Sequence, residues 1–218
     1  VASAAPVLAA CPAAPRSLCR LGGKNSLRMV DASPDNGDRF SWKWGKGTAN
    51  GPGDFGTPTT TTALSVCLYD ATGLIAALDL PAAATCGAAP CWSADSKGFT
   101  YRDAGGTQAG VQSAKLQAAK QASVSVSAKG LGVPLPPLPL AGPLTLQLSR
   151  SDSEICFESI FSATTITRND PSQVRARVAL TTATPLPALG STGCGTPLSG
   201  YTAGASTVDS LVHAGLTR

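Results

Sequence analysis

RFSWKWGK, residues 39–46, places an aromatic ring at three alternate positions. Because successive side chains of a β-strand point to opposite faces, Phe40, Trp42 and Trp44 share one face, and the polar residues between them share the other. The stretch is therefore predicted to be a strand with a wall of rings on one side. That wall belongs either to the core or to a ligand-binding platform, and general burial preferences favour the core by roughly two to one.

The same period of two recurs over about 150 residues, with turn sequences between the runs. After a first run around Leu27 and Met29, further strands are predicted at Leu64–Tyr69, Leu74–Leu80, Gly98–Asp103, Val111–Ala118, Ser123–Lys129, Leu144–Arg150, Glu154–Phe161 and Gln173–Val178. The segment Ala109–Ala122 is rich in Ala and Lys and is the one helical rival, but the alternation that follows it favours a strand. About ten strands without an amphipathic helix predict an all-β antiparallel sandwich, jelly-roll or immunoglobulin-like.

The domain boundaries follow from changes in composition. Residues 1–18 are rich in Ala and Pro and are expected to form an extended tail or a lone strand. Residues 19–180 are expected to form the sandwich, and residues 181–218 a Thr, Pro and Gly-rich extension. Val133–Pro143 is too rich in proline for a regular ladder; it is predicted to cross between sheets, with a ligand for an aromatic groove as the less favoured interpretation.

Charge and hydropathy exclude several classes of protein. Charged residues make up 14% of the chain, which is typical of secreted wall or matrix proteins. The net charge is +4, but the Lys and Arg residues are scattered singly, so no nucleic-acid partner is predicted. No membrane span is expected, because the best apolar run, Val133–Leu148, is interrupted by five prolines.

Seven cysteines with a single histidine predict disulfides and an extracellular or cell-surface protein. The start at Val1 resembles a mature end left by signal-peptide cleavage. Cys86 and Cys91 flank a turn and are expected to form a local clip rather than a redox pair.

The other cysteines leave more than one pairing open. Cys67 and Cys156 lie inside strands, where they form either an inter-sheet disulfide or two separate thiols. Cys11, Cys19 and Cys194 remain. Since the number of cysteines is odd, at least one is unpaired or bonded to another chain, and a cysteine in a tail is the natural candidate.

Enzymatic chemistry finds little support. The only histidine, His213, lies in the C-terminal extension, and no Ser stands in a nucleophile motif. Glu158 could form a catalytic carboxylate pair with an Asp, but it shares a strand with Cys156, and a solvent-facing position explains it equally well. The turn DASPDNGD, residues 31–38, has its Gly one place too late for a calcium loop and no closing Glu, which favours a capped turn. No catalytic residue, cofactor or metal ligand is therefore predicted.

Five short motifs resemble a group of uncharacterised secreted bacterial proteins. They are WKWGKG (42–47), DFGTP (54–58), VCLYD (66–70), CGAAPCW (86–92) and ICFESIF (155–161). The resemblance covers roughly residues 19–180. It implies a β-sandwich and no known activity.

Two functions from different classes follow. The first is a structural subunit of an extracellular filament, polymerising with identical subunits by donating its N-terminal strand through Val1, Val7 and Leu8. The alternative is a monomeric carbohydrate-binding or adhesive module that holds surface polysaccharide on exposed aromatic rings. Its candidate ligand-facing residues are Trp42, Trp44 and Trp92.

Overall fold

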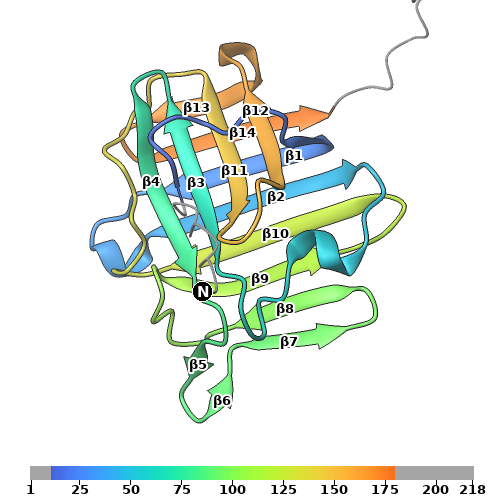
Figure 1. The fold of residues 1–218 in the computed structure, drawn as a ribbon. Helices are drawn as coiled ribbons and strands as arrows, with labels where there is room; N and C mark the ends of the chain where they lie inside the picture. The colour runs from blue at the N-terminus through green and yellow to red at the C-terminus, as the bar shows by residue number, and fades with distance from the viewer. Residues whose placement is uncertain (1–10, 180–218) are drawn as a thin grey trace, which may run out of the picture. The chain divides into compact units, whose positions relative to one another are not determined.

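The computed structural model describes residues 11–179, and within this range the fold is all-β, with no α-helix (Figure 1). The strands are β1 (Arg20–Val30), β2 (Arg39–Gly47), β3 (Leu64–Asp70), β4 (Gly73–Leu80), β5 (Thr85–Cys86), β6 (Ala89–Pro90), β7 (Trp92–Asp95), β8 (Gly98–Arg102), β9 (Val111–Gln117), β10 (Ala122–Lys129), β11 (Leu144–Arg150), β12 (Cys156–Phe161), β13 (Ile166–Asp170) and β14 (Gln173–Ala179). Short 3-10 turns lie at Asp35–Gly37, Pro52–Phe55 and Ala163–Thr165.

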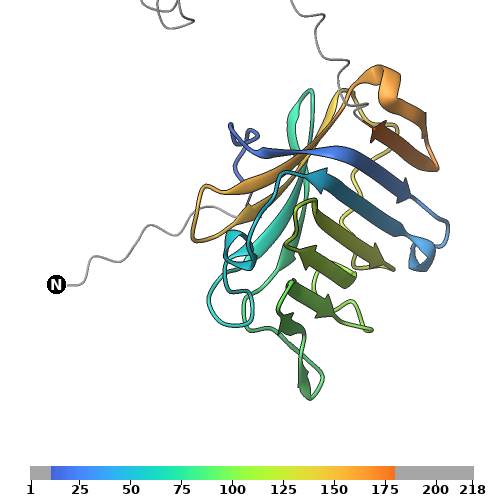
Figure 2. The same cartoon turned by 90° about the vertical axis from the view of Figure 1, so that its right-hand side faces the viewer.

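Twelve of the strands form one curled, mixed sheet, and β5 and β6 form a separate hairpin. The sheet has two limbs. The first limb holds β4, β3, β11 and β12; the second holds β13, β14, β1, β2, β10, β9, β8 and β7. In Figure 1 the strands of the first limb run in front of and across those of the second, and Figure 2 shows the two limbs from the side.

The limbs join at the beginning of β1. Arg20 and Leu21 pair in parallel with Phe157 and Glu158 of β12, and β1 then continues as an antiparallel neighbour of β14 and β2. The expectation of a purely antiparallel fold is therefore wrong at this junction. Strand β1 pairs with β12 of the first limb only through Arg20 and Leu21, and from Gly22 onward it pairs with β2 and β14 of the second limb.

The aromatic wall of β2 lies in the core between the limbs. Phe40, Trp42 and Trp44 are at most 2% exposed. Nε1 of Trp42 donates a hydrogen bond of 2.9 Å to Oγ of Ser159 on β12. The ring of Trp44 meets that of Phe157 edge-on at 5.2 Å between centroids. The alternation of RFSWKWGK thus forms core, because its rings face the opposite limb.

The Pro-rich segment runs from the end of β10 to the start of β11 and so crosses from the second limb to the first, as expected. This segment forms no strand, and a side chain holds part of its backbone instead. The Asn169 side chain donates to the Leu140 C=O at 2.8 Å and accepts from the Leu140 N–H at 2.9 Å. In the described part of the chain no helix is both long and apolar enough to cross a bilayer.

Candidate functional site

The outer face of the second limb is the most unusual surface of the described chain. In its strands, buried apolar residues alternate with polar residues that point away from the first limb. We call the polar set the basic face. Its members are Arg175 and Arg177 (β14), Lys24, Ser26 and Arg28 (β1), Arg39, Ser41 and Lys43 (β2), Ser125, Ser127 and Lys129 (β10), Ser113 and Lys115 (β9), and Thr100 and Arg102 (β8).

In one row across the strands, cations alternate with hydroxyls. The register places one row of directly opposed residues over six strands: Arg177, Ser26, Lys43, Ser125, Lys115 and Thr100. Each cation of this row has a hydroxyl beside it. The row therefore offers charge and hydrogen-bond donors or acceptors at the spacing of neighbouring strands, roughly 5 Å.

The charges of the basic face have no acidic partners among residues 11–179. Its nine cations are Lys24, Arg28, Arg39, Lys43, Arg102, Lys115, Lys129, Arg175 and Arg177, and none takes part in the ion pairs of this range. Those ion pairs join Arg16 to Glu154, Arg20 to Asp54, Arg150 to Asp152 and Arg168 to Asp170. Asp170 on β13 and Asp95 on β7 lie at the two edges of this face, but β14, β1, β2, β10, β9 and β8 between them carry no carboxylate. Soluble surfaces usually mix both signs of charge, so the absence of carboxylates from these six strands is more than a solvated face requires.

Like charges even stand directly opposite each other. Arg28 faces Arg175 across the β1–β14 pair, and Arg39 faces Lys129 across the β2–β10 pair. Directly opposed like charges destabilise a sheet. An anion bound between the members of such a pair would relieve this repulsion.

Three hollows indent this face. The broad hollow, about 580 Å³, is lined by Lys24, Ser26, Lys43, Lys46, Ser125 and Arg177, among others. The middle hollow, about 530 Å³, includes Thr100, Arg102, Lys115 and Ser125. The small hollow, about 210 Å³, includes Arg28, Arg39, Ser41, Gln112, Ser127 and Lys129. Ser125 is shared by the first two and Gln112 by the last two, so the hollows adjoin one another, and we call the series the track.

The rings expected to face a ligand lie elsewhere. Trp42, Trp44 and Trp92 are 0%, 1% and 4% exposed. Nε1 of Trp92 donates to the C=O of Pro81 at 2.9 Å, and its ring packs edge-on against Tyr101 at 5.1 Å. The hypothesis of ligand-facing tryptophans is therefore wrong, because all three rings serve the core.

The cysteines of the first limb bond to the N-terminal segment and not to each other. The disulfides are Cys11–Cys67, Cys19–Cys156 and Cys86–Cys91. The Cys86–Cys91 clip is as predicted. A Cys67–Cys156 bond is wrong because β11 lies between their strands, and a disulfide cannot span two strand spacings. Both side chains instead point to the outer face of the limb, where residues 11–19 lie.

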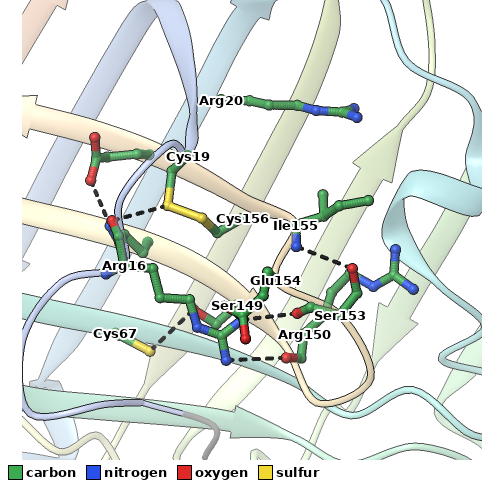
Figure 3. Close-up of a disulfide and its surroundings, with 12 residues drawn as sticks. Arg16, Cys19, Arg20, Cys67, Ser149, Arg150, Ser153, Glu154, Ile155 and Cys156 are labelled. Carbon is green, nitrogen blue, oxygen red and sulfur yellow. Dashed lines mark hydrogen bonds and ion pairs between the residues drawn. A yellow bond between two sulfur atoms is a disulfide. The ribbon is translucent and has the colours of Figure 1, made fainter. Parts of the chain in front are cut away.

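We call residues 11–19 the strap, and Arg16 is its main anchor (Figure 3). The Arg16 backbone N–H donates to Oε1 of Gln147 at 2.9 Å, and Nε2 of Gln147 donates back to the Arg16 C=O at 2.8 Å. The Arg16 guanidinium donates to the C=O of Ser153 at 2.9 Å. Glu158 accepts from Gln147 at 2.5 Å, so this carboxylate supports the strap. The strap lies on the outer face of the first limb, whereas no other segment of residues 11–179 lies over the basic face of the second limb.

Other candidates from the sequence give no site. In the 31–38 turn, the Asp38 carboxylate accepts the Ala32 N–H at 2.8 Å, which is the contact of a capped turn. Within residues 11–179 no three His, Cys, Asp or Glu side chains are grouped to hold a metal. Val1, Val7, Leu8, Cys194 and His213 lie outside the described residues.

No protein-family model, curated protein or solved structure was found to match this chain. The resemblance to secreted bacterial proteins stays a prediction. The basic face was missed in the sequence because its cations are separated along the chain and meet only through strand register. The signal that could have found it is the outward half of each alternating run, which is almost entirely Lys, Arg, Ser or Thr.

Proposed function

We propose that the protein is a non-enzymatic, extracellular binding protein that holds an anionic polysaccharide on the basic face. The observation that carries this proposal is the set of nine cations that have no acidic partner among residues 11–179 and share one face with serine and threonine hydroxyls. The two limbs serve, in this proposal, as the layers of a β-sandwich whose outer surface presents the site. Three disulfides support an extracellular location.

The chemistry of the face favours an acidic polysaccharide over a single-stranded nucleic acid. Proteins that bind single strands stack bases on exposed aromatic rings, and the rings of these strands are buried on the opposite side. Serine and threonine hydroxyls both donate and accept hydrogen bonds, which suits a polymer rich in hydroxyl groups. The adjoining hollows would give an extended chain several points of contact.

The test compares two variants that each lose two positive charges. One is Lys43→Ser with Arg177→Ser, in the central row; the control is Lys97→Ser with Lys120→Ser, in the turns. Exposed ion pairs contribute up to about 1 kcal/mol each, so the first variant should bind dextran sulfate about tenfold more weakly than the control. Affinity should also fall as salt rises.

Two outcomes would overturn the proposal. One is an equal loss of affinity in both variants, which would mean that net charge alone attracts the polymer. The other is tight binding of duplex DNA together with no binding of dextran sulfate or polygalacturonate, which would assign the face to nucleic acid.

The second candidate is the filament subunit that donates its N-terminal strand. The observation that favours it is strand β4, which pairs with β3 on one side and with no other described strand on its free side. Its sequence GLIAALDL is apolar except for Asp79, and apolar edge strands are templates for strand addition. Because Cys11 is bonded to Cys67, the donor in this proposal is residues 1–10.

Electron microscopy tests the filament. Filaments of the full chain should disappear on deletion of residues 1–10, and also with Val7→Asp and Leu8→Asp, which keep the length of the segment. Monodisperse full-length protein, or filaments that survive both changes, would count against strand donation.

A further inference from the structure

The small hollow has a different character from the rest of the basic face. Three cations, Arg28, Arg39 and Lys129, surround it, and the hydroxyls of Ser41 and Ser127 lie among them. Its volume of about 210 Å³ compares with about 580 Å³ for the broad hollow. Pockets that hold a whole small molecule usually exceed about 300 Å³, so this one suits a single charged group.

Strand register brings the three cations together. Arg39 stands directly opposite Lys129, and Arg28 stands opposite Ser41, two residues from Arg39. Lys129 lies about 5 Å from Arg39, as an opposed residue, and Arg28 about 7–8 Å from Arg39, as a diagonal neighbour. Arg28 and Lys129 lie on the two strands that flank β2, so their long side chains can reach one anion held above β2 from both sides. None of the three forms an ion pair or a side-chain hydrogen bond with residues 11–179.

We propose that the small hollow is the subsite for a tetrahedral oxyanion ester, a sulfate or phosphate monoester group carried by the polysaccharide. The inference rests on the proposed function, because it assigns the charged substituent of that same polymer. A sulfate or phosphate ester presents three terminal oxygens, whereas a carboxylate presents two. The two guanidinium groups, the ammonium, the two hydroxyls and the Gln112 amide offer more donors than two oxygens can accept.

The broad hollow serves the sugar chain in this arrangement. It lies at the other end of β1 and β2, where the lining includes Lys24, Lys43 and Arg177. Its size admits a sugar ring, and its cations are spaced by Ser26 and Ser125. A polymer lying along the track therefore places backbone sugars over the broad and middle hollows and an esterified group in the small one.

Two triple variants with the same change in charge test the assignment. The small-hollow variant carries Arg28→Ser, Arg39→Ser and Lys129→Ser; the control carries Lys24→Ser, Lys43→Ser and Arg177→Ser. Dissociation constants are measured for dextran sulfate, which carries sulfate esters, and for polygalacturonate, which carries only carboxylates. The wild type should prefer dextran sulfate at equal charge density. The small-hollow variant should lose that preference by about tenfold, while the control loses affinity for both polymers alike.

Competition identifies which ester the hollow takes. Inorganic sulfate and inorganic phosphate are each added to the wild type, and the one that displaces dextran sulfate at lower concentration names the group. Equal loss of the sulfate preference in both variants would overturn the subsite. Wild-type binding to both polymers without preference would overturn the subsite and leave the proposed function standing. If neither polymer binds, but phosphate shifts the thermal midpoint and only the small-hollow variant loses this shift, the proposed function is overturned and the anion subsite stands.

Discussion

Gly47 shows at the scale of one residue why the motif WKWGKG carries its glycines. A Cβ atom placed on Gly47 would lie 1.8 Å from Cη2 of Trp44, because the buried ring lies over this position. A Cβ atom on Gly45 would have Lys24 O at 3.4 Å as its only close neighbour. Gly47 therefore leaves room for the Trp44 ring, whereas Gly45 has space for a side chain.

The variant Gly47→Ala should therefore lower the free energy of unfolding by about 1–3 kcal/mol, which is the usual effect of overpacking a core. Gly45→Ala is the matched control and should change it little. Urea unfolding followed by tryptophan fluorescence measures both. Equal stability of the two variants would mean that the Trp44 ring does not pack over Gly47.

Arg28 stands opposite Arg175, so the repulsion between them should be measurable in the free protein. Arg28→Thr should raise the free energy of unfolding by about 0.2–1 kcal/mol at low salt, and by less at high salt. The control is Arg102→Thr, since Arg102 stands opposite Ser113 and lacks a cationic neighbour across that pair. A gain in stability on removing Arg28, together with weaker binding of dextran sulfate, is the signature of a residue kept for function. A loss of stability in the Arg28 variant would contradict this account.

At the scale of elements, the strap makes the two limbs unequal. Gln147 on β11 points to the outer face but is fully buried, because the strap lies over it. Its side-chain amide forms hydrogen bonds with the Arg16 backbone and with the Glu158 carboxylate. Among residues 11–179 no comparable segment covers the basic face of the second limb. The disulfide-bonded strap therefore distinguishes the outer face of the first limb from that of the second.

The disulfide that holds the strap to β12 should contribute more stability than the local clip. Cys19 and Cys156 are 137 residues apart, whereas Cys86 and Cys91 are 5 apart. Chain-entropy arguments give about 5 kcal/mol for the long loop and about 2 kcal/mol for the short one. The double variants Cys19→Ala with Cys156→Ala and Cys86→Ala with Cys91→Ala are well matched, since each pair has one buried and one half-buried member. Urea unfolding gives the ranking, and the reverse order would show that strain or residual structure outweighs loop length.

At the scale of the whole molecule, the sequence predicted the strands well and their assembly less well. Alternation located β2, β9 and β10 because each pattern is local. The parallel junction of Arg20 and Leu21 with β12 depends on pairing across more than a hundred residues, which no local pattern encodes. The Cys67–Cys156 pairing failed for the same reason, since strand order decides which distant sulfurs meet, whereas the local Cys86–Cys91 clip was predicted correctly.

The basic face could not be predicted from the sequence for the same reason, because it depends on strand order and register. Lys43 and Arg177 are far apart in the chain, yet each stands directly opposite Ser26. Along the sequence they are two isolated cations; in the sheet they are two members of one row. A prediction of the basic face needs the order and register of the strands, whereas the prediction of buried tryptophans needs only the period of two.

Acid should weaken the folded molecule through two carboxylates. A hydrogen bond from Arg20 lowers the pKa of Asp54, and one from Arg150 lowers the pKa of Asp152, both from an ordinary value of 3.8. A carboxylate whose pKa is lower in the folded state stabilises the fold above its unfolded pKa, and this contribution is lost as pH falls through the folded pKa. Stability should thus be steady from pH 7 to about 4 and fall below that. The double variant Asp54→Asn with Asp152→Asn should be less stable at pH 7 and show a shallower decline in thermal scans.

An anionic polymer should offset this loss only while it keeps its charge. A ligand that binds the folded state alone raises its stability by RT ln(1 + [L]/Kd), about 2.7 kcal/mol at a hundredfold excess over Kd. Sulfate esters stay ionised at pH 3, whereas uronic carboxylates, with a pKa close to 3.5, are largely protonated there. Dextran sulfate should therefore raise the thermal midpoint at both pH 7 and pH 3, whereas polygalacturonate should raise it much more at pH 7 than at pH 3. The variant Lys43→Ser with Arg177→Ser, which is expected to bind about tenfold more weakly, should lose about half of the gain in stability at this excess of polymer. Equal protection by polygalacturonate at pH 7 and pH 3 would mean that the polymer is held by something other than the charges of the basic face.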